Sequence, residues 1–231
     1  MGSPALDVED RTVYPVEERV GEDILQRWIV ELLRPLIDRW LRERAETCFV
    51  GADQFLYFEQ YNPGKRVAPD VYVLPNVASD THVRSWKAWE TKIVPSFALE
   101  IVSLDWEKDY IDAPQAHAEL GTQELFIFDP LHTERRDGVR WQRYTRSPAG
   151  RFTLAQRTDD DRIASAVLGC LLRVVGFQQK QRLRLGLAPD GEVLFPTEAE
   201  AEEAAKEEER RAKEAALERV AELEAMLKLR S

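Results

Sequence analysis

Two acidic residues occur in apolar segments of the chain, where a carboxylate is expected to serve a function. Asp70 stands at the start of the apolar run 71–74, and Glu100 interrupts the run 97–102. An ionised carboxylate in a buried strand costs several kcal/mol unless a cation or hydrogen-bond donors compensate it. Antiparallel or neighbouring strands could bring the two carboxylates together, although thirty residues separate them in the sequence. Such a pair suits a hard cation such as Mg²⁺, which is bound partly by water, activates water and screens phosphates.

The segments around Glu100 predict a parallel βαβ unit. Residues 97–102 and 125–128 have the apolar density and the branched side chains of buried strands. A polar, helix-like segment and a turn at Gly121 join them, and parallel neighbours need a connection of this length. Glu100 is therefore expected within a parallel pair of strands.

The remaining patterns up to residue 196 predict a mixed α/β fold (α+β mixed sheet). Residues 22–44 carry apolar side chains at intervals of three and four, which indicates an amphipathic helix that Pro35 should kink. Short apolar runs bounded by turn residues predict strands. These strands are expected at 48–50, 54–58 and 69–74, with 140–144 and 152–156 as one hairpin and 182–185 and 193–195 as another.

The segment 77–95 combines tryptophans with basic residues and has no regular pattern. Trp86 and Trp89 are interleaved with Arg84 and Lys87. Basic residues beside aromatic rings can grip a phosphate chain and stack on bases. Tryptophans in such a segment can equally anchor a loop to the core. The sequence leaves both interpretations open.

Composition and charge exclude several classes of protein. A formal net charge of -10 argues against a protein that coats nucleic acid and leaves room for a localised basic patch. No window approaches eighteen unbroken apolar residues, so we expect no membrane span and predict a cytoplasmic location. Cys48 and Cys170 lie far apart and lack neighbouring ligands at metal-binding spacing, so neither a disulfide framework nor a zinc site is expected.

The composition changes from residue 197 onward to alanine, glutamate, lysine, arginine and leucine. This segment has 11 acidic and 7 basic residues and no glycine or proline, with Thr197 in position to cap a helix. Apolar residues spaced four, three and four apart form a short coiled-coil seam: Ala216, Val220, Leu223 and Leu227. The seam could join two copies of the chain, or the segment could be a single solvated helix held by internal ion pairs.

The order of four motifs resembles the Uma2 (DUF820) family of the PD-(D/E)XK restriction-endonuclease-like superfamily. The motifs are APDVYVL around Asp70, FALEIVS around Glu100, an aspartate-rich helix and LGTQELFIFDP. The resemblance covers roughly residues 22–195. An acidic, alanine-rich helical tail is also frequent in that family.

The resemblance implies a central mixed sheet flanked by helices, as a restriction-endonuclease-like domain in residues 21–196. Residues 1–20 would then be a loose N-terminal arm and residues 197–231 a charged helical tail with coiled-coil character. It also implies that Asp70 and Glu100 hold Mg²⁺ or Mn²⁺, while a lysine orients the water that hydrolyses a phosphodiester bond. The implied substrate is nucleic acid, with DNA as the first choice.

The lysine is where this sequence departs from the family pattern. The two usual positions hold Val102 and Ala113, while Asp109 matches the aspartate that usually precedes the lysine by four residues. Lys108 could substitute, because it lies near the start of the same helix and has a flexible side chain. A lysine there could also be solvated and paired with Asp112.

Two further residues near these motifs are interpreted as structural. His117 occupies the place of a usual tyrosine and is expected to be a packing residue rather than a base. Asp129 ends its strand before Pro130 and is expected to be a turn or cap residue.

Two functions are consistent with these patterns. The first is a Mg²⁺-dependent endonuclease with Asp70 and Glu100 as ligands and Lys108 as the third catalytic residue. The alternative is a catalytically weakened descendant, which binds nucleic acid or a protein through its sheet domain and dimerises through its C-terminal helix. A purely structural role is the third option.

Overall fold

The computed structural model describes residue 12 and residues 24–103, 106–134, 138–187 and 189–228. The predicted arm, residues 1–20, lies outside this set apart from Thr12. Two units are distinguished, Met1–Leu194 and Phe195–Ser231, and each is described by itself.

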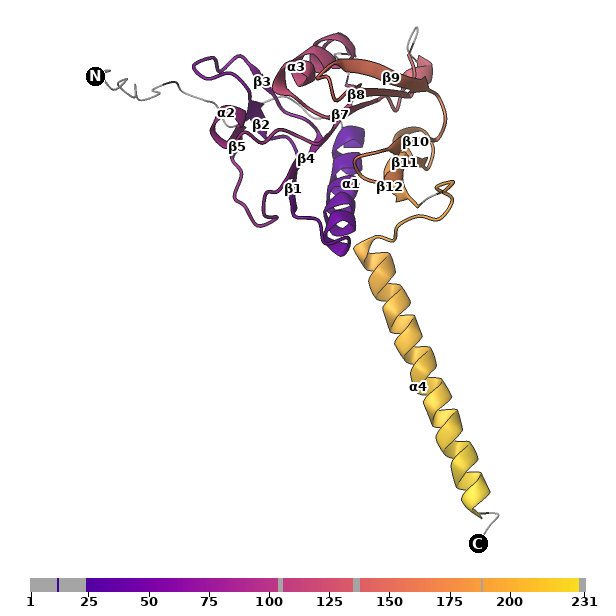
Figure 1. The fold of residues 1–231 in the computed structure, drawn as a ribbon. Helices are drawn as coiled ribbons and strands as arrows, with labels where there is room; N and C mark the ends of the chain where they lie inside the picture. Colours follow the sequence, from indigo (N-terminus) through magenta and orange to yellow (C-terminus); the bar gives the residue numbers. More distant parts are fainter. Residues whose placement is uncertain (1–11, 13–23, 104–105, 135–137, 188, 229–231) are drawn as a thin grey trace, which may run out of the picture. The chain divides into compact units, whose positions relative to one another are not determined.

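A six-stranded mixed sheet forms the centre of the first unit (Figure 1). Its order is β1-β4-β6-β7-β8-β9; β6 and β7 are parallel, as predicted, and the other neighbours are antiparallel. The strands are β1 (Cys48–Gly51), β4 (Val71–Pro75), β6 (Phe97–Ile101), β7 (Glu124–Phe128), β8 (Trp141–Arg146) and β9 (Phe152–Thr158). The predicted mixed α/β fold is confirmed, and so is the hairpin formed by β8 and β9.

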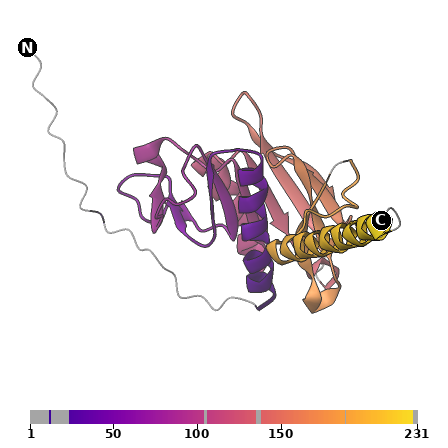
Figure 2. The ribbon, with the colours of Figure 1, turned by 90° about the horizontal axis from the view of Figure 1, so that it is seen from below.

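Two small sheets lie on either side of the first helix, α1 (Ile24–Glu43), in both ribbon views (Figures 1 and 2). One has the order β3-β2-β5, with β2 (Phe55–Tyr57), β3 (Arg66–Val67) and β5 (Ser85–Lys87). The other has the order β10-β11-β12, with β10 (Arg162–Ser165), β11 (Cys170–Val175) and β12 (Arg182–Gly186). The segment 77–95 lacks a regular pattern in the sequence, but strand β5 and helix α2 (Ala88–Thr91) occupy part of it.

The predicted hairpin of residues 182–185 and 193–195 is present only in part, because its second strand is reduced to a single antiparallel bridge. β12 pairs antiparallel with β11, whereas Leu194 makes an isolated bridge to Gly186. The β11–β12 ladder buries alternate residues of the two strands: Leu172, Leu183 and Leu185. Val193, by contrast, is 65% exposed. β12 therefore forms a full ladder with β11 along one edge, and its other edge meets the following segment in one bridge.

The helices agree with the amphipathic patterns of the sequence. α1 continues through Pro35 and buries one apolar stripe: Leu25, Ile29, Leu33, Leu36, Ile37 and Leu41. The crossover between β6 and β7 contains a π-helical segment, η1 (Lys108–Asp112), followed directly by α3 (Ala113–Leu120). Two 3₁₀ turns complete the set, η2 (His132–Glu134) and η3 (Gln178–Lys180). Within the described ranges, no helix has the length and apolar character needed to cross a membrane.

The central sheet is buried on both faces. On one face, residues of β4, β6 and β7 share a core cluster with Leu120 of α3: Tyr72, Ala98, Leu125 and Ile127. On the other face, α1 contacts β1 and β4, and the Phe97 and Phe126 rings lie 5.5 Å apart. Side chains alternate between faces along a strand, so Glu100 points to the same face as Ala98, toward α3.

A buried glutamate connects the central sheet to the turn between β10 and β11. Glu124, at the start of β7, is 2% exposed. Its carboxylate accepts hydrogen bonds from the Ser165 hydroxyl at 2.6 Å and from the N–H groups of Ala166 and Val167 at 3.2 and 3.3 Å. These donors compensate the desolvated carboxylate and fix the turn against the sheet.

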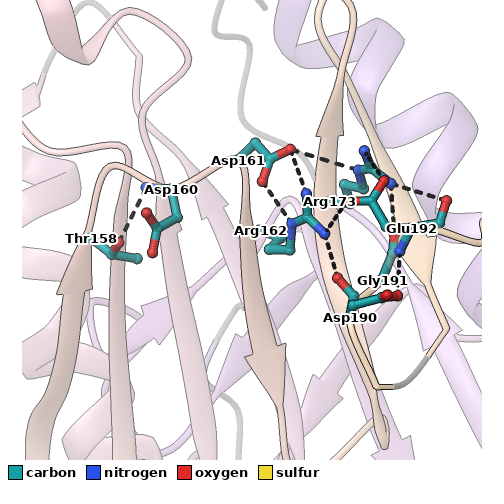
Figure 3. A network of polar contacts seen from close by, with 8 residues as sticks. All are labelled: Thr158, Asp160, Asp161, Arg162, Arg173, Asp190, Gly191 and Glu192. Carbon is teal, nitrogen blue, oxygen red and sulfur yellow. Dashed lines mark hydrogen bonds and ion pairs between the residues drawn. The ribbon is translucent and has the colours of Figure 1, made fainter.

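A network of charged residues fixes the far end of β10 and β11 (Figure 3). Arg162 pairs with Asp161 at 2.7 Å and with Glu192 at 2.8 Å. Arg173 pairs with Glu192 at 3.1 Å and donates to the Gly191 carbonyl at 2.8 Å. Both arginines thus hold the loop around residue 191 against the small sheet rather than forming an open basic patch.

Helix α4 (Glu198–Lys228) makes up most of the second unit. The Glu200 N–H donates to the Thr197 hydroxyl at 3.2 Å and the Thr197 N–H donates to the Glu200 carboxylate at 2.7 Å, so Thr197 caps the helix as predicted. Four apolar side chains are 46–60% exposed: Leu217, Val220, Leu223 and Met226. The predicted seam also includes Leu227, whose side chain lies outside the description.

Replacing Glu124 with alanine should destabilise the fold strongly. The change leaves a buried hydroxyl and two backbone N–H groups without their acceptor, which should lower the free energy of unfolding by about 3 kcal/mol. Urea unfolding with an unchanged m-value measures this loss. Glu90→Ala, which breaks a pair with Lys87 at 3.3 Å on the surface, is the control and should cost less than about 1 kcal/mol. Equal losses in the two variants would contradict the interpretation of Glu124.

Candidate active site

The two predicted carboxylates lie on neighbouring strands. Asp70 comes directly before β4, and Glu100 is in β6. The antiparallel register pairs Val71 with Leu99, so its continuation places Asp70 opposite Glu100. The Ile101 N–H donates to Asp70 Oδ2 at 2.6 Å. Strand pairing therefore brings together the residues that the sequence singled out.

Asp70 is held by donors from two different elements. Its carboxylate, in a residue that is 4% exposed, accepts one hydrogen bond from the backbone of β6. The Gln26 side-chain amide of α1 donates to the other oxygen, Oδ1. Gln26 was missed in the sequence, because nothing in an amphipathic pattern distinguishes it from the other polar residues of α1.

Both carboxyl groups have raised pKa values. Burial raises the pKa of Asp70 well above its ordinary range, and the charge of Glu100 raises it further, against the opposing effect of the Gln26 hydrogen bond. Burial also raises the pKa of Glu100 well above its ordinary range, Asp109 adds to this, and Lys108 opposes it. Two such groups side by side favour a shared proton or a bound cation over two bare charges.

His117 of α3 contacts Glu100 directly. Its Nε2 lies 2.9 Å from Glu100 Oε1, and its Nδ1 lies 2.8 Å from the Thr122 hydroxyl. The imidazole is fully buried, and burial lowers the pKa of His117 to about 3. His117 is therefore part of the site, although the sequence suggested packing alone. The signal was available: a polar residue four positions before the helix-ending Gly121 faces the sheet.

Lys108 is the first residue of the π-helical segment η1 and acts electrostatically on Glu100. Lys108 is exposed, and its charge counteracts the rise in the pKa of Glu100. The next residue, Asp109, accepts hydrogen bonds from the Ser103 N–H at 2.7 Å and the Ser103 hydroxyl at 2.8 Å, which ties η1 to the end of β6. The Tyr110 hydroxyl donates to the carboxylate of Asp129 at 2.8 Å. Lys108 thus projects from an anchored segment.

Asp129 has the structural role that the sequence indicated. It is fully buried, and its Oδ1 accepts the Leu131 N–H at 2.8 Å in the turn after β7. Trp86 is an anchor as well: it is 9% exposed, belongs to the core cluster of Leu120, and its Nε1–H donates to the Ile93 carbonyl at 2.9 Å. The structure therefore favours the loop-anchor interpretation for Trp86.

An exposed acidic residue, Asp53, lies next to the carboxylate pair. With Asp70 and Gln26 it lines a hollow of about 200 Å³, whose other walls are Arg27, Val30 and Glu31. The charge of Asp53 contributes to the raised pKa values of both Asp70 and Glu100. The sequence did not single out Asp53, because it lies in a turn after β1, outside any apolar run.

Comparison with known proteins identifies the family. The Uma2 family, described as "Putative restriction endonuclease", matches residues 16–174. The chain belongs to the Uma2 family. A similar solved structure is that of "a putative nuclease belonging to DUF820 from Anabaena variabilis ATCC 29413", with 12% sequence identity, a TM-score of 0.43, and coverage of 64% of this chain and 75% of that chain. No curated protein matches.

The donor set of this Uma2 chain fits a hydrated hard cation. Among the described residues, no three His, Cys, Asp or Glu side chains gather into a metal-binding group. Two adjacent carboxylates with raised pKa values are still a suitable anchor for Mg²⁺, which keeps several water ligands and is often held by one or two carboxylates. Asp70 and Glu100 are the residues that could hold it.

The usual lysine positions of the Uma2 pattern have other roles in this chain. Val102 is 5% exposed, and its N–H donates to the Phe128 carbonyl at 2.8 Å. Ala113 is the first residue of α3. Lys108 therefore remains the lysine nearest to these positions in the described crossover.

Without metal, replacing Glu100 with glutamine should stabilise this Uma2 chain at neutral and alkaline pH. Because the pKa values of Asp70 and Glu100 are raised by folding, the folded state binds more protons, and wild-type stability falls as pH rises through those values. The variant removes one of the two charges and should be more stable by on the order of 1 kcal/mol at pH 8, with no gain at pH 4. Urea unfolding in a chelator measures the difference.

The matched control for this measurement is Glu119→Gln. Glu119 lies on the exposed side of α3, and its pairing with Lys65 at 2.5 Å lowers its pKa, so its loss should bring no gain in stability at pH 8. A wild type as stable as Glu100→Gln at pH 8 would contradict the mutual repulsion of the pair.

Proposed function

We propose that this chain is a metal-dependent endonuclease that hydrolyses phosphodiester bonds of nucleic acid, with DNA as its substrate. The observation that carries the proposal is the pair of adjacent carboxylates, Asp70 and Glu100, with raised pKa values in an apolar sheet. Membership in a family described as "Putative restriction endonuclease" supports the same chemistry. A cytoplasmic location fits this function.

Asp70 and Glu100 would hold Mg²⁺ or Mn²⁺. When bound, the ion supplies positive charge against the phosphate and increases the acidity of a coordinated water. The chain prepares both ligands for this task. Gln26 and the Ile101 N–H hold Asp70, and His117 holds Glu100.

Lys108 is proposed as the residue that orients the attacking water. Its position on η1 and its electrostatic effect on Glu100 support this role. In the reaction, the water oxygen forms a bond to phosphorus, the bond from phosphorus to the leaving oxygen breaks, and a proton passes from the water to solvent or to the leaving oxygen. An ammonium beside the water would fix its direction of attack.

Metal titration and plasmid nicking on the same samples test the nuclease. Wild type should bind Mn²⁺ by calorimetry and nick a supercoiled plasmid with Mg²⁺ or Mn²⁺. Glu100→Gln should bind Mn²⁺ at least roughly tenfold more weakly and nick roughly a hundredfold more slowly, while its far-UV spectrum stays unchanged. Glu119→Gln, a surface change on α3, should behave as wild type. Nicking that persists in Glu100→Gln would refute the proposal.

The same assay separates Lys108 from the metal ligands. Lys108→Ala should lower the nicking rate by roughly a hundredfold and change the Mn²⁺ affinity much less than Glu100→Gln does, because the lysine acts on water and is not a ligand. Lys213→Ala, in α4, is the control for loss of a positive charge. An unchanged nicking rate in Lys108→Ala would remove Lys108 from the mechanism.

A catalytically weakened binding module is the second candidate function. The observation that favours it is the occupation of the usual lysine positions by Val102 and Ala113. Such a protein would bind Mn²⁺ and nucleic acid or a protein partner but would not nick. Metal-dependent nicking by wild type that is lost in Glu100→Gln would exclude this candidate.

We also propose that α4 joins two copies of the chain as a parallel coiled coil. Val220 and Leu223 occupy successive core positions, a and d, of the seam. Valine at position a with leucine at position d favours a coiled coil of two parallel helices. In that orientation Arg219 faces Glu224 of the second copy, five residues further along the helix, which gives complementary charge on both sides of the seam.

Sedimentation equilibrium of the full chain tests the coiled coil. Wild type should self-associate with rising concentration, and Leu223→Glu should weaken the association at least roughly tenfold, because it places two like charges in the seam. Ala225→Glu adds the same charge on the opposite side of α4 and should have little effect. A wild type that stays monomeric at every concentration would rule out the dimer.

A further inference from the structure

We propose that His117 is a positioning residue that, together with Thr122, holds the Glu100 carboxylate in its metal-binding orientation. This inference rests on the proposed function, since it concerns how one metal ligand is prepared. His117 contacts Glu100 and is not itself one of the proposed reacting groups.

The contacts of His117 are complete at both ring nitrogens. Nε2 lies 2.9 Å from Glu100 Oε1, and Nδ1 lies 2.8 Å from the Thr122 hydroxyl oxygen. His117 and Thr122 are both 0% exposed. Buried polar groups need hydrogen-bond partners, and the partner of His117 Nε2 is the carboxylate of Glu100 itself, so this contact can hold the orientation of Glu100.

The metal-bound state would fix the direction of the two hydrogen bonds. A carboxylate that ligates a cation is ionised and can only accept, so His117 Nε2–H would donate to Glu100 in that state, and Nδ1 would accept the Thr122 hydroxyl proton. A hydroxyl can donate or accept, so Thr122 is able to satisfy Nδ1 in the tautomer that donates to Glu100.

The end of α3 fixes the ring and its partner together. Gly121 adopts a left-handed conformation, with φ of 99°, and its N–H and that of Thr122 both donate to the His117 carbonyl at 3.1 Å. Arg146 of β8 donates to the Ala118 carbonyl at 2.7 Å and to the Thr122 carbonyl at 3.0 Å. The end of α3 and Arg146 of β8 thus fix the positions of His117 and Thr122 relative to each other.

A donor that burial holds in place suits the task of positioning a metal ligand. An N–H of the buried His117 ring directed at Glu100 Oε1 would fix the rotation of that carboxylate. Hydrogen bonds of this kind to metal-ligating groups commonly change metal affinity by about 10–100-fold. Lys108, by contrast, is exposed and bears a flexible side chain, so it cannot supply the same fixed contact.

The test measures Mn²⁺ affinity by calorimetry on the full chain, which does not depend on cleavage. His117→Leu, which lacks a donor, should bind Mn²⁺ about 10–100-fold more weakly than wild type. His117→Gln, whose amide can reach the same carboxylate oxygen, should restore the affinity to within about threefold of wild type. Thr122→Val keeps the ring in place but removes the hydroxyl, and it should weaken binding by about three- to tenfold.

Leu120→Ala is the control for packing in α3. Leu120 is 4% exposed on the same helix, and its truncation should lower the midpoint of thermal unfolding without changing the Mn²⁺ affinity. If His117→Leu does not fold, the Mn²⁺ affinities of Thr122→Val and His117→Gln are compared with that of wild type. A loss of affinity without a donor and its recovery with glutamine would indicate positioning, whereas a loss of packing would change only the unfolding midpoint.

The outcomes for this inference and for the proposed function differ. If wild type binds Mn²⁺ and both His117→Leu and Thr122→Val bind it equally well, the positioning role is overturned and the nuclease proposal stands. Weak binding in His117→Gln, equal to that in His117→Leu, also overturns the role of the donor. If wild type binds no Mn²⁺, both proposals fail together.

Discussion

The side-by-side burial of two carboxylates is the constraint on which the rest of the first unit depends. Asp70 and Glu100 lie on adjacent strands of an apolar sheet, and burial raises both of their pKa values. Such a pair is costly in a protein without a compensating cation or donors. The surrounding elements supply part of the compensation: the backbone of β6, Gln26 of α1 and His117 of α3.

The elements on both sides of the sheet therefore do more than cover it. α1 buries an apolar stripe and, from its polar side, reaches Asp70 through Gln26. α3 packs Leu120 into the core and directs His117 at Glu100. Between β6 and α3, the π-helical η1 is anchored through Asp109 and Tyr110 and contains Lys108, whose charge opposes the raised pKa of Glu100. Irregular helical turns of this kind often occur at functional sites.

Not every buried charge in the chain belongs to this site. Glu124 has a hydroxyl and two N–H groups as donors and connects two sheets. Burial alone therefore does not distinguish Glu124 from the candidate metal ligand Glu100. Glu100 has a neighbouring carboxylate, since its charge raises the pKa of Asp70, whereas Glu124 accepts hydrogen bonds from Ser165, Ala166 and Val167. Active sites commonly retain such local conflict at a cost in stability.

The sequence alone determined the elements whose information is local or periodic. The runs around Glu100, α1, the β8–β9 hairpin and the cap at Thr197 were predictable, because each depends on a short pattern of apolar, turn or capping residues. Asp70 and Glu100 stood out because charges in apolar strands are costly. The tertiary structure decided that β12 pairs with β11, and it brought Gln26, Asp53 and His117 to the site. These contacts join elements that are distant in the chain, and which side chains meet there is set by packing, which no local pattern records.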